Sequence, residues 1–357
     1  MDKYYNAKKQ EIISKLNKDD INYVFISDIH YMGISTGQGA VLLEQMKQAV
    51  DLANECENID LVILGGDTVQ GYWDDKHECF EAYREILAAL KKCNKPVLIL
   101  NGNHDDNAYA AWNENFSMKI ISDFDWQKEI LGPYAVKKRV HNEAEPNAKY
   151  YYYDFKKGNK TIRAFCLDAT DYKTEYDENG VVTRLNFAND NNENTPEGSY
   201  KYQTGMSYWG YSTEQLRWLA DSLSRADFDD VIIFSHMGID RQANFRDIRL
   251  GDELRNILRA YKRKTEYKNE ELGIDVSYNN GGKVLIYHYG HIHREAMLYF
   301  EDIGFWQIAS STARADQADP FAERGAGTEN EPCFDIVSVK QDKITKYNIG
   351  GGTNFQC

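Results

Sequence analysis

Short hydrophobic runs recur along the chain, and each is followed by a polar or glycine-containing turn. The runs span residues 23–26, 61–64, 97–100, 231–234 and 284–287. Runs of this length that are rich in β-branched residues and bounded by Gly, Asn or Ser are typical of buried strands. The pattern therefore predicts five buried strands, and residues 150–167 add a β-hairpin.

Hydrophobic residues recur at helical spacing elsewhere in the chain, over residues 41–53, 80–90, 216–223 and 254–261. Ser212 and Gln215 stand at the beginning of the third of these helices. They form a capping-box pattern, in which Ser212 is the N-cap and Gln215 occupies the third helical position. Strands that alternate with helices predict an α/β fold with at least partly parallel sheets.

We expect one domain over residues 1–357, with residues 1–19 as an N-terminal helical extension. Neither an internal repeat nor a linker-like segment divides it. Three stretches interrupt the alternation of strands and helices, and we expect these insertions to shape the substrate site. They are a mixed helical and loop segment at 106–147, a polar, Asn-rich segment at 171–211 and a charged loop at 313–332.

The 357 residues carry a formal net charge of −14. Such an acidic chain is poorly suited to bind the phosphate backbone of nucleic acids, so we do not expect a nucleic-acid partner. The six cysteines form no CxxC pair, which favours free thiols in a reducing compartment. Because neither a signal-peptide pattern nor a transmembrane run is present, we expect a cytoplasmic protein without a membrane partner. The sequence does not indicate an oligomeric state.

Side chains that can bind metal ions follow each of the five predicted strands. They are Asp28 and His30 after the first strand, Asp67 after the second, Asn103, His104 and Asp105 after the third, His236 after the fourth, and His291 and His293 after the fifth. Ligands of open α/β sheets bind beyond the carboxyl ends of the strands. Since five of the eight histidines fall at such positions, we expect these residues to form one site.

This mixture of side chains suits two metal ions. Imidazole binds borderline cations such as zinc and iron, whereas carboxylate and amide oxygens suit harder cations. A carboxylate such as that of Asp67 can bridge two ions, which can hold a hydroxide and stabilise both sides of a displacement at phosphorus. The DxH and HxH spacings direct alternate side chains the same way if the backbone is extended. Glycines beside Asp67, Asn103 and His291 permit tight turns.

The ordered motifs resemble the signature of the calcineurin-like metallophosphoesterases. The matching blocks are Asp28-x-His30, Gly66-Asp67, Gly102-Asn103-His104-Asp105, His236 and Gly290-His291-x-His293. One block alone would be weak evidence, but the full ordered set is specific. The resemblance implies an α/β fold with a central β-sandwich of two mixed sheets, flanked by helices in the layer order α/β/β/α. It also implies a binuclear metal centre that hydrolyses phosphoric esters.

The same resemblance implies a role for each residue. One metal ion would be held by Asp28, His30, Asp67 and His293, and the other by Asp67, Asn103, His236 and His291. A hydroxide between the ions would be the nucleophile, and the ions would be divalent or trivalent manganese, iron or zinc. His104 would lie outside the metal shell, as a stabiliser of the phosphate or as the acid that protonates the leaving oxygen. Asp105 would orient His104 by a hydrogen bond, although a turn or N-cap role is nearly as well supported.

Differences from known branches of the family narrow the range of expected substrates. Residues 68–73 lack the Asp-Arg-Gly that Ser/Thr protein phosphatases carry after the bridging aspartate. The acidic charge argues against the nuclease branch, and the sequence around Ile29 argues against purple acid phosphatases. The remaining resemblance implies a small soluble phosphodiester or phosphomonoester that is nucleotide-like or glycerophosphodiester-like. A catalytically weak metal-binding scaffold or regulatory protein of the same fold is the alternative, and the complete ligand set argues against it.

Aromatic and basic residues near these motifs have two interpretations each. Tyr72, Trp73 and the aromatic cluster at 208–211 suit stacking on a nucleobase, although packing is the simpler role for the cluster. Arg314 and Arg324 suit contact with a phosphate from the 313–332 loop, although surface salt bridges are the simpler role.

Overall fold

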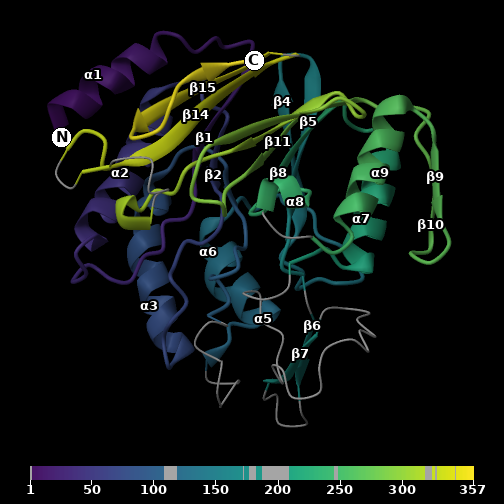
Figure 1. Ribbon diagram of the computed structural model, residues 1–357, viewed down its shortest axis with the longest axis horizontal. Helices are drawn as coiled ribbons and strands as arrows, with labels where there is room; N and C mark the ends of the chain where they lie inside the picture. Colours follow the sequence, from purple (N-terminus) through teal and green to yellow (C-terminus); the bar gives the residue numbers. More distant parts are fainter. Residues whose placement is uncertain are drawn as a thin grey trace.

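The computed structural model describes residues 2–107, 119–171, 173–176, 182–186, 209–244, 248–317, 324–325, 328–341 and 343–357. Within these residues, two mixed sheets of six strands each pack together, and helices flank the pair on both sides (Figure 1). The predicted α/β fold with a central sandwich of two mixed sheets is therefore confirmed. No helix in the described parts of the chain combines the length and apolar character needed to span a membrane.

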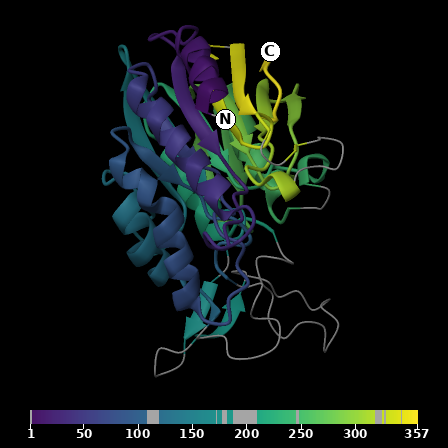
Figure 2. The same ribbon diagram turned by 90° about the vertical axis from the view of Figure 1, so that its left-hand side faces the viewer.

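The first sheet has the strand order β16-β15-β14-β1-β2-β3. Its strands are β1 (Ile21–Ile26), β2 (Leu61–Leu64), β3 (Val97–Ile99), β14 (Cys333–Lys340), β15 (Lys343–Gly350) and β16 (Phe355–Gln356). The strands β1, β2 and β3 are parallel, and β14 runs antiparallel to β1. On the outer side of this sheet lie α1 (Asp2–Ile13), α2 (Gly39–Glu55) and α3 (Lys76–Ile86), which continues as a 3₁₀ helix over Leu87–Lys92 (Figure 2).

The second sheet has the strand order β12-β13-β11-β8-β5-β4. Its strands are β4 (Tyr151–Lys157), β5 (Lys160–Leu167), β8 (Asp230–Ser235), β11 (Lys283–Tyr289), β12 (Ala296–Phe300) and β13 (Phe305–Ala309). The four inner strands are parallel, whereas β12 and β4 are antiparallel strands at the two edges. The helices α7 (Thr213–Ser224) and α9 (Gly251–Arg263) flank this sheet.

The sandwich core explains why the strands could be recognised in the sequence. Every residue of β1, β2 and β8 is buried, because helices cover one face of each sheet and the partner sheet covers the other. Tyr23 of β1 packs edge-on against Phe234 of β8 across the sandwich, with ring centroids 5.1 Å apart. All five predicted strands are present, as is the hairpin, which is formed by β4 and β5.

The remaining elements are short and lie around this frame. They are α5 (Asp123–Asp125), a π-helical turn over Trp126–Leu131, α6 (Gly132–Tyr134), β6 (Lys173–Tyr176), β7 (Val182–Asn186), α8 (Arg241–Asn244), β9 (Glu266–Asn269), β10 (Ile274–Ser277) and a 3₁₀ turn over Ala315–Gln317. Parts of all three predicted insertions lie outside the described residues, namely 108–118, 172, 177–181, 187–208, 318–323 and 326–327. Their role at the substrate site and the single-domain organisation remain predictions.

The predicted capping box of α7 is only half correct. Ser212 is the N-cap, and its hydroxyl accepts a hydrogen bond from the Gln215 amide at 3.0 Å. The Gln215 side chain does not return to the amide of Ser212, because it bonds both backbone groups of Asp168 at the end of β5, at 2.8 and 2.9 Å. Gln215 therefore joins α7 to the second sheet instead of closing the cap.

Candidate metal centre

The residues predicted to bind metal ions converge beyond the carboxyl ends of parallel strands from both sheets. Two groups of side chains each bring one ligand atom per residue within 4.8 Å of one another. The first group consists of Asp28 and His30 after β1, Asp67 after β2 and His293 after β11. The second consists of Asp67, His236 after β8 and His291 after β11. Asp67 belongs to both groups, so they share one carboxylate.

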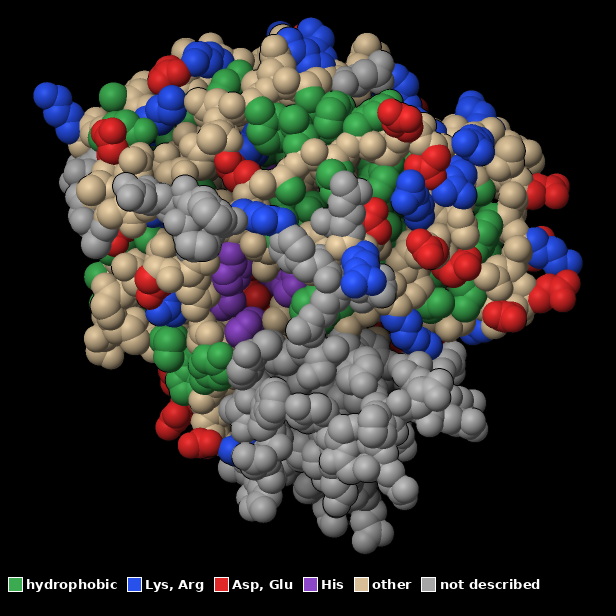
Figure 3. All heavy atoms as spheres, in the orientation of Figure 1, with side chains coloured by type: hydrophobic (Ala, Val, Ile, Leu, Met, Phe, Trp, Pro, Cys, Tyr) green, Lys and Arg blue, Asp and Glu red, His purple; other side chains and the backbone are tan. Residues whose placement is uncertain are grey.

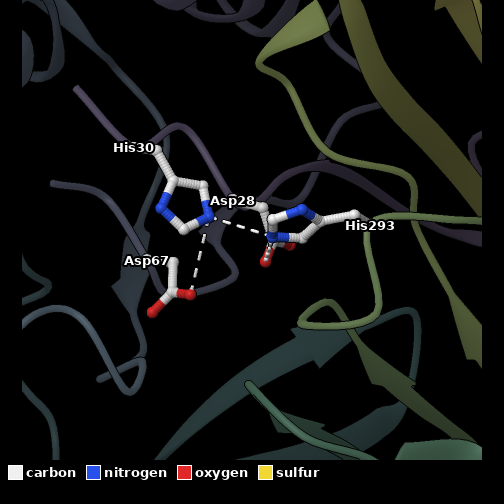
Figure 4. Close-up of side chains that lie close together, drawn as sticks. All are labelled: Asp28, His30, Asp67 and His293. Atoms are coloured by element: carbon white, nitrogen blue, oxygen red, sulfur yellow. Dashed lines mark hydrogen bonds and ion pairs between the residues drawn. The ribbon is translucent and has the colours of Figure 1, made fainter. Parts of the chain in front are cut away.

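In the first group, the four side chains surround a common centre (Figure 4). His30 Nε2 lies 3.0 Å from His293 Nε2 and 3.7 Å from Asp67 Oδ2, and His293 Nε2 lies 3.4 Å from Asp28 Oδ1. Asp28, His30 and Asp67 are at most 1% exposed. Imidazole and carboxylate atoms that converge this closely in a buried place form a donor set that fits a transition-metal ion.

In the second group, His236 faces the shared carboxylate. Its Nε2 lies 3.2 Å from Asp67 Oδ2, and its ring centroid lies 5.2 Å from that of His291. This nitrogen is buried without a well-oriented hydrogen-bond partner among the described residues. A buried polar atom of this kind is costly unless something binds it, so the second group also fits a metal ion.

Asn103 lies on the turn after β3, beside the shared carboxylate. The amide of the next residue, His104, donates to Asp67 Oδ1 at 2.9 Å, and Asn103 itself is buried. A Cβ at Gly102 would lie only 2.2 Å from Asp67 Oδ1. Glycine therefore permits the close approach of this turn to Asp67. Gly290 likewise permits the turn after β11 to approach Asp28 closely, since a Cβ there would lie 2.4 Å from Asp28 Oδ2.

Backbone carbonyl groups orient three of the histidine rings. The contacts join His236 Nδ1 to Gly65 O at 2.8 Å, His293 Nδ1 to Gln317 O at 3.0 Å, and His104 Nδ1 to Gln70 O at 2.7 Å. A carbonyl can only accept, so each Nδ1 carries the proton and donates it. Each Nε2 is therefore left to face the site, which is the arrangement that orients histidine ligands of metal ions.

Most of the predicted ligands have a left-handed backbone conformation. The φ angle is 53° at Asp28, 47° at His30, 51° at Asp67, 66° at His291 and 55° at His293. The DxH and HxH segments are therefore not extended, so the condition under which alternate side chains would point the same way is not met. Such conformations cost roughly 1–3 kcal/mol per residue and cluster at functional sites. Bonds between turns stabilise them, as when the His291 amide donates to both carboxylate oxygens of Asp28 at 3.0 Å.

Burial and charge act against each other in the site. Burial lowers the pKa of His30 well below its ordinary value and that of His291 to about 3, so both rings are neutral near pH 7. Burial alone would raise the pKa of Asp28, but the hydrogen bond from His293 and nearby imidazolium charge hold it at about 2. Burial likewise opposes protonation of His236, yet the Asp67 charge raises the pKa of His236 to about 10. The ionised carboxylates and the neutral rings of His30 and His291 favour the binding of cations, whereas His236 must lose its proton before it can bind one.

His104 lies at the edge of the centre and outside both groups. Its Nε2 is 3.9 Å from Asp67 Oδ2, and its ring meets the His30 ring edge-on with centroids 4.6 Å apart. The side chain is 12% exposed, more than Asp67 at 1%, so it faces the mouth of the site. This position is compatible with contact to a substrate.

Asp105 does not have the position that was predicted for it. Its buried carboxylate accepts hydrogen bonds from the amides of Gly102, Asp67 and Thr68 at 2.8, 2.8 and 2.9 Å, and from the Tyr83 hydroxyl. The expectation that it orients His104 is wrong, because the ring of His104 bonds a carbonyl instead. Asp105 fixes the turn that presents Asp67, which agrees with the alternative turn role.

The support of the metal centre by residues 310–317 was not predicted from the sequence. The Thr312 hydroxyl donates to the Asp28 carbonyl at 2.6 Å, and the Ser311 hydroxyl donates to the His293 carbonyl at 3.2 Å. Gln317 supplies the carbonyl that orients His293. This segment follows β13, a further parallel strand, so recognition of that strand would have pointed to the segment.

The two arginines of the 313–332 loop differ from each other. Arg314 forms the predicted salt bridge, with Nε 2.6 Å from Asp316 Oδ1, and also donates to the His30 carbonyl at 2.9 Å. Arg324 is buried, and its guanidinium donates to the carbonyls of Thr312 and Ala313. The prediction of a surface salt bridge for Arg324 is therefore wrong. The buried side chain instead stabilises the segment 310–317 through these backbone hydrogen bonds.

Two aromatic side chains contact the histidines of the site. The ring of Trp209 meets that of His291 edge-on with centroids 4.4 Å apart, and the ring of Tyr72 lies 6.2 Å from that of His104. Tyr211 is buried and its hydroxyl bonds that of another tyrosine at 2.8 Å, which agrees with the packing role. Residue 208 lies outside the described part of the chain.

Comparisons with known proteins agree with this geometry. The family described as calcineurin-like phosphoesterase matches residues 21–295. The human protein named manganese-dependent ADP-ribose/CDP-alcohol diphosphatase is 26% identical over 250 residues, which is 64% of this chain and 69% of that protein. The crystal structure of a dimetal phosphatase from Danio rerio has a TM-score of 0.59 at 16% identity, covers 94% of this chain and 98% of its own, and shares the fold. The chain belongs to the calcineurin-like phosphoesterase family and is a metal-dependent phosphoesterase.

Proposed function

We propose that this chain uses two metal ions to hydrolyse small phosphoric esters of a nucleotide-like or glycerophosphodiester-like kind. The observation that carries the proposal is that Asp67 belongs to both groups of converging side chains. A shared carboxylate holds two ions close enough to act on one phosphoryl group. This arrangement favours catalysis over a purely structural metal site, because structural sites are closed and do not need a bridging ligand.

We assign the ligands in two sets that share Asp67. The first ion would bind Asp28, His30, Asp67 and His293, and the second would bind Asp67, Asn103, His236 and His291. When bound, the ions would act as Lewis acids on a phosphoryl oxygen and would activate a water molecule as the nucleophile. The neutral rings of His30 and His291 offer nitrogen lone pairs without first losing a proton.

His104 is proposed to donate a proton to the leaving oxygen. Its Nδ1–H is held by the Gln70 carbonyl, so its Nε2 is available to a substrate at the mouth of the centre. A proton donor that is not itself a metal ligand can act on the leaving group without loss of the ions. Asp105 is a positioning residue in this scheme, because it fixes the backbone of Asp67 and does not face the substrate.

Manganese and nucleoside diphosphate esters should be tested first, because the human relative is named as manganese-dependent and as a diphosphatase of ADP-ribose and CDP-alcohols. The protein would be loaded with manganese, iron or zinc, and its metal content would be measured. It would then be assayed on p-nitrophenyl phosphate, bis-p-nitrophenyl phosphate, ADP-ribose, CDP-choline and glycerophosphodiesters. We expect turnover of at least one diester or diphosphate with two metal ions per chain. Absence of turnover with both ions bound would favour the alternative, a metal-binding scaffold.

A further inference from the structure

Exposed hydrophobic side chains lie beside the proposed metal centre. Met32, Ile34 and Tyr72 are 39%, 58% and 45% exposed, and each follows a segment that carries a proposed ligand. The two segments lie together, because the Gln70 amide donates to the Tyr31 carbonyl at 3.2 Å. Hydrophobic atoms (green) adjoin the histidines (purple) on the face seen in Figure 3. Exposed apolar surface next to a reaction centre is typical of a substrate-binding surface.

Tyr72 is attached to the same turn that orients His104. The Gln70 carbonyl bonds His104 Nδ1 at 2.7 Å, and Tyr72 follows two residues later with its ring 6.2 Å from the His104 ring at an interplanar angle of 75°. Gly71 makes this possible, because its φ angle is 71° and a Cβ there would lie 2.1 Å from the His104 carbonyl oxygen. Residues 70–72 therefore fix the proposed proton donor and present an aromatic ring beside it.

We infer that Tyr72 determines specificity by stacking on a flat aromatic ring of the leaving group. The leaving group would then be a nucleoside 5′-phosphate, released from a nucleoside diphosphate ester. The inference rests on the proposed function, since it takes His104 as the donor of a proton to the leaving oxygen. Tyrosine suits this role, because an aromatic face stacks on any base and Tyr72 is 45% exposed as a residue.

The reaction follows from this placement. The oxygen of water forms a bond to the phosphorus that does not bear the nucleoside and loses one proton to the solvent, and the bond from that phosphorus to the bridging oxygen breaks. The bridging oxygen leaves with the nucleoside monophosphate and takes the proton of His104. Trp209 is less suited to the leaving group, because its ring contacts His291 of the second ligand group and not His104.

A binding measurement tests Tyr72 without any need for turnover. Calorimetry on the manganese-loaded protein would compare AMP with ribose 5-phosphate, which lacks the base. We expect the wild-type protein to bind AMP about 5- to 10-fold more tightly, at the low end of what stacking provides for a partly exposed ring. Tyr72→Ala should abolish this preference, and Tyr72→Phe should keep it because the aromatic face remains.

Tyr299→Ala is the matched control, because Tyr299 is similarly exposed at 49% but lies on the edge strand β12. This variant should bind AMP like the wild-type protein. If Tyr72→Ala, with its metal content unchanged, still prefers AMP over ribose 5-phosphate, the inference is overturned. The same holds if Tyr299→Ala reduces the preference equally, since the effect would then not be specific to Tyr72.

Hydrolysis of ADP-ribose in water labelled with oxygen-18 tests the side on which the nucleoside leaves. We expect the label in ribose 5-phosphate and none in AMP, because water attacks the phosphorus remote from the nucleoside. Label in AMP would overturn the leaving-group assignment. If no phosphoric ester is turned over at all, the proposed function fails, and the calorimetry still decides whether Tyr72 recognises an aromatic ring.

Discussion

The fold contains two buried groups of acidic side chains whose charges are neutralised by different residues. In one, Lys346 Nζ lies 3.1 Å from Asp335 Oδ1 and also contacts Glu295, and Lys346 and Asp335 are both fully buried. In the other, Asp28 and Asp67 face histidines, and neither forms an ion pair with a lysine or arginine within the part of the chain that the structure describes.

The difference separates a structural group from a functional one. The ammonium group of Lys346 neutralises the buried carboxylate, so this cluster needs no bound metal ion. In the centre, His30 and His291 are neutral and His236 is charged only while it keeps its proton, so bound metal ions can replace that charge. The centre should therefore gain stability from added metal ions, because ligands that bind only the folded state stabilise it. The Lys346 cluster should stabilise the fold whether or not metal is present.

The largest expected effect comes from removal of the shared carboxylate. Asp67→Asn should eliminate binding of both metal ions and reduce hydrolysis below detection, because each ion loses the ligand that joins the two groups. Metal analysis and turnover of a phosphodiester measure the two losses. Asp275→Asn, on an exposed strand far from the centre, is the control and should behave like the wild-type protein. Two bound ions in Asp67→Asn would contradict the assignment of a bridging ligand.

His104→Ala tests whether the histidines of the centre divide into metal ligands and a proton donor. We expect both ions to remain and kcat to fall roughly 10²–10⁴-fold on alkyl esters, the usual contribution of general acid catalysis. The fall should be smaller on p-nitrophenyl esters, whose leaving group needs little protonation. His77→Ala, at an exposed position on α3, is the matched control. Loss of a metal ion from His104→Ala would show that the division of roles is wrong.

Lys346→Met tests whether the Lys346 cluster stabilises the fold independently of metal ions. It leaves Asp335 buried without its cation, which should destabilise the fold by about 3–5 kcal/mol. Urea unfolding of metal-free and metal-loaded protein should give the same loss, because this cluster does not depend on metal. Lys343→Met, at the exposed start of β15, should change little. Recovery of stability in the double variant Lys346→Met with Asp335→Asn would confirm that the unpaired carboxylate causes the loss.

The sequence predicted the strands and the members of the centre for a physical reason. Strands buried on both faces are continuous hydrophobic runs, and the turns after them carry five of the eight histidines of the chain. The edge strand β12 was not predicted, because Met297 and Tyr299 on one of its faces are exposed and the strand lacks a continuous buried run. The role of residues 310–317 was missed with it, since their position depends on the neighbouring β13.

Side-chain partners could not be predicted in the same way. Asp105 and Arg324 both bond backbone groups of distant turns, and no periodic pattern in a sequence indicates such contacts. The left-handed backbone at Asp28 and His30 is equally invisible, because it is imposed by bonds between loops rather than by the residues themselves. A sequence therefore indicates which residues gather at strand ends, whereas the folded structure determines how each is held.

The smallest expected effect comes from a third charged group, the partly exposed ion pairs of Asp302. This group differs from the two buried ones because solvent reaches it. Hydrogen bonds from Arg255 and Arg259 lower the pKa of Asp302 from 3.8 to about 2. The stabilisation is therefore present above pH 4 and is lost as the pH falls through about 2. Asp302→Asn should lower the free energy of unfolding by about 1 kcal/mol or less at pH 6, because solvent and salt screen exposed pairs. Urea unfolding at pH 6, 4 and 3 should show the difference from the wild-type protein shrinking with pH. A difference that grew toward low pH would mean that the carboxylate is not held ionised by the arginines.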